Sequence, residues 1–487
     1  MESIADYLEK QAVERPDSDF LTERGNTLSF AEMFSRVRRM SYFLSENGVR
    51  KGDRVILVIE GRTNHLITYF ASMALGAIPV HLHTQRPGDF VRFAAKDTEA
   101  NLIVTENYGE SIGDIPSRIV SFPDLDGDLP ELWSRERCEV AYMMYTSGTT
   151  GRPKAVMTSQ ANTLFTANTI IDFAQLTNTE RELICLPLAF TFGLGHIHSQ
   201  LILGGQAHLF QSMRDTSAML NIIATDRITG FLASPGMIKV LVENYLEEFT
   251  TKAKNLRYIV INCTPMPVHL TKKLLKLFPD TRIYMYYGLT ESSRSAFNFY
   301  NENLDKLDCT GRATKGVSLK IANANSDGEG EICIKGPNVM LGYWGEKESS
   351  CIDAEGWLHT GDMGVMDEAG FITVRGRVKE QISVDGMKCQ PLEVENVLNL
   401  HHEVMESAVV GLPDEYTYQT VSAAVVLRSD QDKTEIIESL QQLCAGRLEQ
   451  FKVPKKFIFV DAIPRTDLGK IKRSEVERMF VEMNRGQ

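Results

Sequence analysis

Apolar and polar positions follow two different periods in the first part of the chain. Residues 30–45 carry apolar side chains at 30, 33, 34, 37, 40, 43 and 44, which predicts an amphipathic helix with Ser29 as its N-cap. Short β-branched runs such as RVILVI at 54–59 predict buried strands. Strands are expected at 54–59, 78–82, 101–105, 139–145, 182–186, 230–233, 258–262 and 282–286, with further helices at 64–75 and 162–173.

The pattern changes twice toward the C-terminus. From about residue 309, short strands and glycine-rich turns predict a β-rich part. The last hundred residues or so predict helices at 392–399 and 434–448 and strands at 406–410 and 421–427. We therefore expect an α/β fold in two domains. The large N-terminal domain, residues 1–377, has mostly parallel sheets and a small β-rich subdomain at about 309–377, and residues 378–487 form a small α+β domain.

Composition narrows the class of protein. Of 487 residues, 43% are apolar and 24% charged, the net charge is −12 and the pI is about 5.5, which argues against a nucleic-acid partner. Eight cysteines lie at least eighteen residues apart with no CxxC, as expected for free thiols in a reducing compartment. No apolar run reaches the ~18 residues that a membrane span needs, and the N-terminus does not resemble a signal peptide. We expect a cytoplasmic protein.

A glycine-rich loop, YTSGTTGRPKA at 145–155, has the chemistry of a polyphosphate site. Glycines admit close approach of backbone N–H groups to an anion, hydroxyls donate hydrogen bonds, and Lys154 adds charge. The spacing is not that of a Walker A loop, because Gly148 and Gly151 are three apart and Ala155 replaces a magnesium-binding hydroxyl. The loop is also expected to join two strands. An ordinary surface turn is the competing interpretation.

The segment YYGLTES at 286–292 follows a predicted strand, and ligands of parallel α/β sheets bind at carboxyl ends of strands. Tyr287 could stack on a base, while Thr290 and Glu291 could reach phosphate and magnesium. A turn with a solvated Glu291 explains the segment equally well.

Two later segments carry single candidates. In GWLHTGDMG at 356–364, Asp362 could accept both hydroxyls of a ribose. In PRTDLGKIKR at 464–473, Lys470 could deliver charge from a second domain. The first could also be a common turn, and the second a solvated basic end.

Taken together and in order, six segments resemble the adenylate-forming (ANL) superfamily, the AMP-dependent synthetases and ligases that include acyl-CoA synthetases and stand-alone adenylation enzymes. They are YTSGTTGRPKA, LPLAFTFGLG (186–195), YYGLTE, GWLHTGDMG, GRVKEQISVDG (376–386) and PRTDLGKIKR. The resemblance covers nearly the whole chain. It implies ATP-dependent activation of a carboxylic acid to an acyl-adenylate with release of pyrophosphate, then thioester formation on a phosphopantetheine thiol.

The resemblance also assigns roles. The β- and γ-phosphates would be held by Thr146, Ser147, Gly148, Thr149, Thr150, Gly151 and Lys154. Tyr287 would stack on adenine, Thr290 would contact the α-phosphate and Glu291 would bind Mg²⁺. The remaining roles are the ribose contacts of Asp362 and Arg377, the bridge from Lys470 to the acid and the α-phosphate, the hinge at Lys379 of a mobile C-terminal domain, and the lining of the thiol tunnel by Gly386.

The acid pocket departs from the family pattern. Its candidate residues are Phe190, Phe192, Gly193, His196, Asn262, Cys263 and Gly288. Phe190 stands where histidine is common, and residues 189–196 contain no acid to pair a substrate ammonium, so a plain acyl or aryl acid is preferred over an α-amino acid. His196 and His198 also fit the commoner role of core histidines.

The sequence leaves open both the thiol acceptor and several competing functions. Ser383 and Asp385 stand where CoA ligases often carry lysines, which favours a carrier protein in trans over CoA. One alternative is a stand-alone enzyme that loads an amino acid onto a carrier protein. Others are a non-catalytic nucleotide-binding relative and a Walker-type ATPase, which the loop spacing disfavours. The cofactors implied are ATP and Mg²⁺, with CoA or phosphopantetheine as acceptor.

Overall fold

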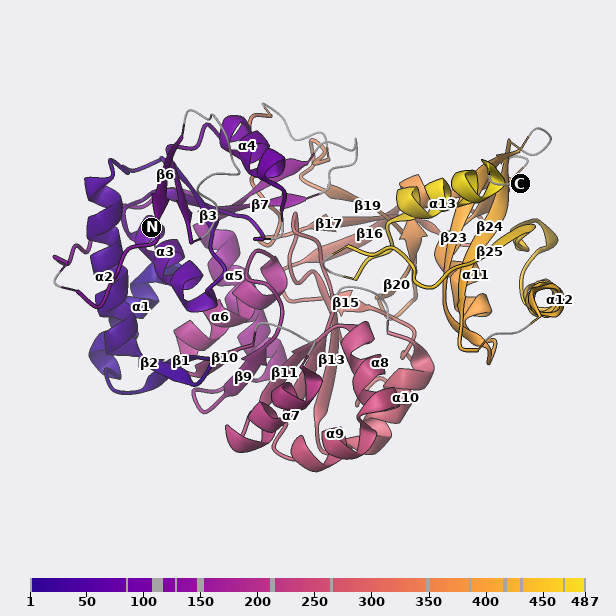
Figure 1. Cartoon of the computed structure of the whole chain (residues 1–487), viewed down its shortest axis with the longest axis horizontal. Coiled ribbons are helices and arrows are strands. Elements are labelled where there is room, and N and C mark those ends of the chain that lie inside the picture. The colour runs from indigo at the N-terminus through magenta and orange to yellow at the C-terminus, as the bar shows by residue number, and fades with distance from the viewer. Residues whose placement is uncertain are drawn as a thin grey trace. The chain divides into compact units, whose positions relative to one another are not determined.

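The computed structural model describes residues 2–84, 86–106, 117–127, 129–146, 153–210, 215–262, 266–346, 351–384, 387–414, 418–429, 432–466 and 469–485 (Figure 1). The chain divides into two compact units. The first unit comprises Met1–Leu319 and Ile334–Leu358, and the second comprises Lys320–Cys333 and His359–Gln487.

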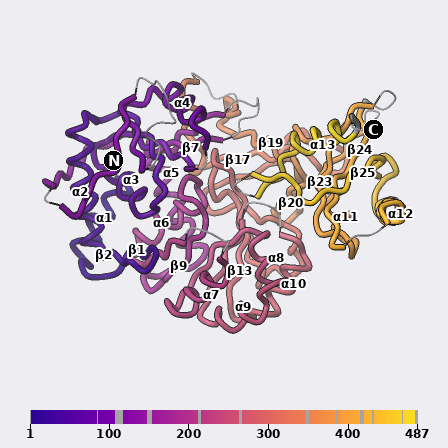
Figure 2. Tube along the Cα trace, in the orientation of Figure 1, coloured from indigo at the N-terminus to yellow at the C-terminus, as the bar shows by residue number. Residues whose placement is uncertain are grey.

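One sheet of the first unit has a parallel centre and antiparallel edges. Its strand order is β15-β14-β13-β12-β11-β9-β10-β1-β2, and the strands from β13 to β1 run parallel. The N-terminal strand β1 pairs with β10, with Leu21 opposite Ala207, so segments far apart in sequence lie side by side (Figure 2). The bounds are β1 (Asp19–Glu23), β2 (Asn26–Ser29), β9 (Arg181–Ile184), β10 (Gln206–Leu209), β11 (Gly230–Ala233), β12 (Tyr258–Ile261), β13 (Arg282–Tyr287), β14 (Ala296–Phe299) and β15 (Gly311–Ala313).

The second sheet of this unit carries the glycine-rich loop. Its order is β18-β8-β7-β4-β3-β5-β6, parallel from β7 to β6 and antiparallel at β7, β8 and β18. The bounds are β3 (Arg54–Val58), β4 (Ile78–His81), β5 (Leu102–Thr105), β6 (Arg118–Ser121), β7 (Val140–Thr146), β8 (Lys154–Ser159) and β18 (Gly342–Tyr343).

Helices cover both sheets, and Figure 1 shows α7 to α10 grouped around the β11–β13 end of the first sheet. The bounds are α1 (Ile4–Glu14), α2 (Phe30–Glu46), α3 (Arg62–Ala74), α4 (Gly88–Asp97), α5 (Gln160–Ala174), α6 (Thr191–Leu203), α7 (Thr216–Thr225), α8 (Pro235–Asn244), α9 (Leu246–Lys252) and α10 (Val268–Leu277). Helix α2 confirms its prediction, since Ser29 and Glu32 form a capping box at its start. Within the described ranges, no helix has both the length and the apolar character needed to cross a bilayer.

The second unit contains two sets of strands. The first, in the order β16-β17-β19-β20, has the bounds β16 (Ser318–Ala322), β17 (Gly330–Lys335), β19 (Leu358–Met366) and β20 (Phe371–Arg377). The second contains β21 (Ile382–Val384), β22 (Met387–Cys389), β23 (Val404–Asp414), β24 (Tyr418–Leu427) and β25 (Lys456–Phe459). Its helices are α11 (Pro391–Leu398), α12 (Lys433–Ala445) and α13 (Arg473–Arg485), with 3₁₀ turns η1 (Val378–Glu380) and η2 (Gln450–Lys452).

The strand β24 is apolar along most of its length because both of its faces are buried. Val421, Ala423 and Val425 join a core with α11 and α12, whereas Ala424 and Val426 join a core with α13. A strand covered on both faces shows no alternation of apolar and polar residues. The predicted fold class, a large α/β N-terminal part followed by a small α+β part, is confirmed.

The compact units divide the chain differently from the predicted domains. Residues 320–333 and 359–377 pack with the C-terminal residues, although they were predicted to belong to the N-terminal domain. The physical reason is the ladder from β16 to β20, whose last strand contacts α11. The hinge at Lys379 concerns motion rather than packing and stays a prediction.

Candidate functional site

The glycine-rich loop connects two antiparallel strands. Strand β7 ends at Thr146, β8 begins at Lys154, and these two residues oppose each other in the ladder. The predicted strand–loop–strand arrangement is therefore confirmed, and it differs from a Walker A loop, which leads into a helix. The five phosphate-loop candidates Ser147, Gly148, Thr149, Thr150 and Gly151 lie outside the described residues, and their role stays a prediction.

The carboxylate of Glu291, in the YYGLTES turn, contacts the last residue of strand β7. Its Oε1 accepts a hydrogen bond from Thr146 Oγ1 at 3.3 Å and another from Tyr343 Oη at 3.0 Å. Burial and the neighbouring Glu291 charge raise the pKa of the Tyr343 phenol, so Tyr343 remains a donor at neutral pH. Oε2 has no hydrogen-bond partner among the described residues. A carboxylate with one open oxygen is a suitable ligand for Mg²⁺.

Lys154, the first residue of strand β8, contacts the same tyrosine. Its Nζ lies 4.5 Å from the centroid of the Tyr343 ring and 2.7 Å from Glu346 Oε1. Lys154 from the glycine-rich loop and Glu291 from the YYGLTES turn, which were predicted from separate motifs, therefore both contact Tyr343. Sequence reasoning missed Tyr343 and Glu346, because a tyrosine and a glutamate in LGYWGE carry no motif of their own.

The YYGLTES turn begins at the carboxyl end of the parallel strand β13, as predicted. Tyr287 is the last residue of that strand and is 7% exposed. A Cβ on Gly288 would lie 2.7 Å from the backbone N of Arg294 and 3.0 Å from the carbonyl of Ser292, so only glycine fits this close backbone approach. Adenine stacking by Tyr287, the α-phosphate contact of Thr290 and a pocket role for Gly288 stay predictions.

The predicted pocket segment forms the start of helix α6. Phe190 precedes the helix and its ring stacks on His83, with centroids 6.0 Å apart. Phe192 is buried edge-on against Tyr286 at 5.3 Å. A Cβ on Gly193 would lie 3.2 Å from the carbonyl of Leu186, so this residue packs against the segment that leaves β9.

His196 lies deeper in α6, in an environment typical of a structural histidine. It is 1% exposed, and its Nδ1 lies 2.8 Å from Oε1 of the fully buried Glu182. Glu182 also accepts hydrogen bonds from Tyr258 at 2.9 Å and from Gln200 at 3.0 Å. These contacts favour the core interpretation weighed from the sequence. Asn262 follows β12, and Cys263 lies outside the described residues.

Arg294 connects the predicted pocket segment to the YYGLTES turn, and no sequence motif pointed to it. The side chain is 1% exposed and donates to the carbonyls of Thr191 at 2.7 Å and Phe192 at 2.8 Å. Its guanidinium fills the space beside Gly195, where a Cβ would come within 2.8 Å of a guanidinium nitrogen. A buried arginine between two motifs fixes the start of α6 relative to the turn that carries Glu291.

In the second unit, Asp362 and Arg377 oppose each other in the β19–β20 ladder. Arg377 Nε lies 2.8 Å from Asp362 Oδ1, and Asp362 is 5% exposed. The two residues predicted to hold the ribose are thus neighbours. Lys379 lies exposed in η1, immediately after β20, and Gly386 lies outside the described residues.

Lys470 lies on an exposed turn of the second unit. Its backbone N donates to Thr466 Oγ1 at 3.2 Å, and its carbonyl accepts from Thr466 N at 2.8 Å. Arg465 pairs with Glu406 at 2.6 Å, and Arg473 donates to Glu380 at 2.9 Å. Both ends of the turn are therefore anchored, while the Lys470 side chain stays exposed, as a residue that reaches a ligand should be.

One group in the described part of the chain has the composition of a metal site. The ligand atoms of Glu331, Cys333 and His359 lie within 4.8 Å of one another. However, Glu331 Oε2 already accepts from His359 Nδ1 at 2.8 Å, and Oε1 accepts from the Gly361 N–H at 2.9 Å. These side chains satisfy one another without an ion.

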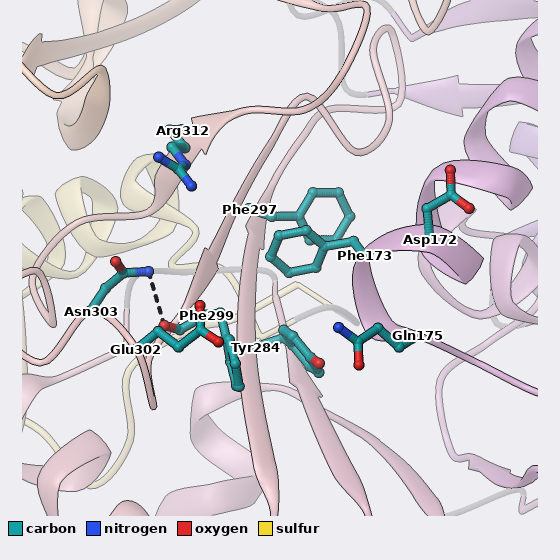
Figure 3. A pocket seen from close by; sticks show the side chains of 9 residues that line it. All are labelled: Asp172, Phe173, Gln175, Tyr284, Phe297, Phe299, Glu302, Asn303 and Arg312. Carbon is teal, nitrogen blue, oxygen red and sulfur yellow. Dashed lines mark hydrogen bonds between the residues drawn. The ribbon is translucent and has the colours of Figure 1, made fainter.

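A shallow cavity of about 250 Å³ lies elsewhere in the first unit (Figure 3). Figure 3 shows the rings of Phe173 and Phe297 against each other, with centroids 4.1 Å apart, and Arg312 and Asp172 farther out. None of the residues that line this cavity belongs to a predicted site.

Comparison with known proteins gives matches over most of the chain. The family described as AMP-binding enzyme matches residues 8–344, and the AMP-binding enzyme C-terminal domain matches residues 393–470. A feruloyl-CoA synthase from an Amycolatopsis species is 30% identical over 478 residues, covering 96% of each chain. A 2-succinylbenzoate–CoA ligase from Bacillus licheniformis is 31% identical over 488 residues, covering 96% of this chain and 98% of the relative.

A solved structure of a CoA synthetase supports the same family relationship. The o-succinylbenzoate CoA synthetase from Bacillus subtilis, in complex with its acyl-adenylate intermediate, has a TM-score of 0.88 and 28% identity, with 97% of each chain covered. The same enzyme was solved with ATP and a magnesium ion, with a TM-score of 0.85.

Proposed function

The chain belongs to the AMP-binding enzyme family, and from this membership we infer that it is an AMP-forming acid–thiol ligase. It activates a carboxylic acid with ATP and Mg²⁺, releases pyrophosphate and transfers the acyl group to a thiol. The predicted superfamily, reaction class and cofactors are confirmed by the family match and by relatives that are named as CoA ligases.

The acid that we propose is aromatic. Two relatives act, by their names, on ferulate and 2-succinylbenzoate, both of which are aryl acids. In this chain the pocket segment offers the half-buried Phe190 stacked on His83, and residues 189–196 contain no carboxylate to pair an ammonium group. The alternative of an amino-acid-loading enzyme therefore lacks the residue that it would need.

CoA is the acceptor that we propose, in place of the carrier protein that the sequence favoured. That preference rested on Ser383 and Asp385, of which Asp385 lies outside the described residues. Ser383 is in β21, where its backbone N–H donates to Gln419 Oε1 at 2.8 Å, so its environment is that of a strand residue. The relatives are named for CoA, and this outweighs two missing lysines.

The first half-reaction brings a carboxylate toward a negatively charged α-phosphate, so like charges must approach. Mg²⁺, when bound at the open oxygen of Glu291, would neutralise phosphate charge. Lys470 would supply the second positive charge from the exposed turn, and Thr146 and Lys154 would hold the leaving pyrophosphate. No covalent nucleophile on the protein is required, since positioning and electrostatics suffice.

The observation that carries this assignment is the shared contact of Thr146 and Tyr343 with Glu291. It joins the phosphate loop to the candidate magnesium ligand, as a site for Mg–ATP requires. A loop and a turn that served only as surface connections would not need this contact.

The test is ATP–pyrophosphate exchange that depends on the added carboxylic acid. We expect exchange with cinnamic, benzoic or arylacetic acids in preference to fatty or amino acids, AMP as the product, and a thioester with CoA. Binding of ATP without exchange for any acid would indicate a non-catalytic relative. ADP as product would indicate a Walker-type ATPase. Thioester formation only on a carrier protein would overturn the choice of CoA.

A further inference from the structure

The turn that carries Asp362 is held by hydrogen bonds to the neighbouring strand β17. Gly361 donates its N–H to Glu331 Oε1 at 2.9 Å. Thr360 Oγ1 donates to the carbonyl of Ile332 at 2.7 Å and accepts from the N–H of Asp362 at 3.0 Å. Each of residues 360–362 is therefore fixed, directly or through Thr360, to strand β17.

Gly361 has a φ of +71°, in the left-handed region that favours glycine. This conformation interrupts the extended backbone of β19 and turns the Gly361 N–H toward Glu331. A side chain at this position would strain the backbone whatever space were available.

The carboxylate of Glu331 is held in one orientation by a second donor. Its Oε2 lies 2.8 Å from His359 Nδ1, and His359 Nδ1 in turn lies 3.5 Å from the Sγ of the buried Cys333. Both oxygens are thus engaged, one by a side chain and one by the backbone of the turn. A carboxylate held in this way links β17 to the turn and restricts the movement of the turn.

Asp362 lies at the end of this set of contacts. It is 5% exposed, with Oδ1 2.8 Å from Arg377 Nε. A nearly buried carboxylate has little freedom to seek a ligand by itself, so the turn sets the direction in which it points. A change of even 1 Å at such a position weakens a ligand contact strongly.

We propose that Glu331 is a positioning residue for nucleotide binding. It fixes the turn at residues 360–361 so that Asp362 presents its carboxylate to a pair of neighbouring hydroxyls, the 2′ and 3′ hydroxyls of a ribose. This proposal rests on the proposed function, because it takes Asp362 as the ribose contact.

The test is a thermodynamic cycle between the protein and the ligand. The dissociation constants of ATP–Mg²⁺ and of 2′,3′-dideoxyATP–Mg²⁺ are measured by isothermal titration calorimetry for the unmodified chain, for Glu331→Ala and for Glu331→Gln. The unmodified chain should bind ATP at least roughly tenfold more tightly than dideoxyATP, as hydrogen bonds to a charged group imply. Glu331→Ala should reduce this preference to less than about threefold, chiefly by weakening ATP.

Glu331→Gln keeps an acceptor for Gly361 and is expected to retain an intermediate preference. This variant keeps the test open should the alanine variant fold poorly. The matched control is Glu329→Ala, two residues earlier, where the backbone of Glu329 pairs with Asn325 rather than with the turn. The control should retain the full preference.

If Glu331→Ala weakened both nucleotides by the same factor, Glu331 would have a general structural role and the proposal would be overturned. Asp362→Ala separates this outcome from a failure of the ribose assignment. If Asp362→Ala left the preference for ATP intact, the ribose contact itself would be wrong. If Asp362→Ala abolished the preference while Glu331→Ala kept it, only the positioning role would fall.

Discussion

Acid should destabilise the first unit through histidines that are buried and uncharged. His65 and His198 are 4% and 2% exposed, and a third histidine, His81, is 1% exposed. His65 Nε2 lies 2.7 Å from His81 Nδ1, and Tyr69 Oη lies 3.0 Å from His198 Nε2. Among the described residues, no carboxylate is hydrogen-bonded to any of these three rings.

The size of this loss of stability follows from the lowered pKa values of the histidines. Burial, and then the charge of Arg62, lowers the pKa of His65 from 6.5 to about 4. Burial, and then the charge of Arg294, lowers the pKa of His198 to about 3. The unfolded chain takes up protons below pH 6.5 whereas the folded chain does not, so stability falls as the pH drops below 6.5. At pH 5 each ring costs about 2 kcal/mol relative to pH 8, and the two together cost about 4 kcal/mol.

The assay is urea unfolding at pH 8 and pH 5, followed by tryptophan fluorescence. The three tryptophans, Trp133, Trp344 and Trp357, all belong to the first unit, so the signal reports on the unit that contains the histidines. His198→Asn should reduce the loss of unfolding free energy between the two pH values by about 2 kcal/mol.

The control is His269→Asn, at an exposed position of the same unit, which should leave the pH dependence unchanged. If His198→Asn lost as much stability between pH 8 and pH 5 as the unmodified chain, the reasoning from burial would be refuted.

Three further predictions concern the site. Tyr343→Phe removes a hydrogen-bond donor to Glu291 and should lower kcat/KM for ATP in pyrophosphate exchange roughly tenfold. The control Tyr300→Phe removes a buried phenol of the same unit and should leave kcat/KM unchanged; equal losses in the two variants would contradict a specific role of Tyr343. Lys470→Ala should lower the rate of adenylation by about 100-fold or more, but the rate of thioester formation from preformed adenylate by less than about threefold, with Lys472→Ala as the control. Similar losses in both rates would contradict a role confined to adenylation. Gly288→Ala places a Cβ 2.7 Å from a backbone nitrogen and should destabilise the chain by about 1–3 kcal/mol in urea unfolding, whereas Gly127→Ala, with open space around it, should be near neutral.

The elements that the sequence predicted well are those with local signals. Helix α2 combines a contrast between apolar and polar faces with a capping box at Ser29, and both signals lie within a few residues of each other. The strands at 230–233 and 258–262 are short apolar runs that match β11 and β12 to within one residue. Such features do not depend on the rest of the fold.

Helix α6 was missed for the opposite reason. Almost every residue from Phe192 to Leu201 is buried, so the segment has no polar face, and two glycines within its first turns oppose a helical prediction. Its stability comes from distant partners, among them Glu182 and Arg294, whose proximity no local pattern reveals. The same applies to Tyr343, which acquires a role only because β18 pairs with β8.

The predicted hinge at Lys379 gains physical content from the packing on either side of it. Gly376 lies before the hinge and Gln390 after it, and a Cβ on Gly376 would come within 2.3 Å of Gln390 Oε1, so the two segments meet closely there. Yet both amide atoms of Gln390 are buried without a hydrogen-bond partner among the described residues, which costs about 1–3 kcal/mol. A rotation at Lys379 would expose this amide to water and recover that cost. Arg473 pairs with Glu380 and Glu395, all on the C-terminal side of the hinge, so this network would survive the motion and carry the Lys470 turn with it. The ion pairs on the C-terminal side of Lys379 would therefore hold that part together during such a motion, as a body that alternates between two half-reactions requires.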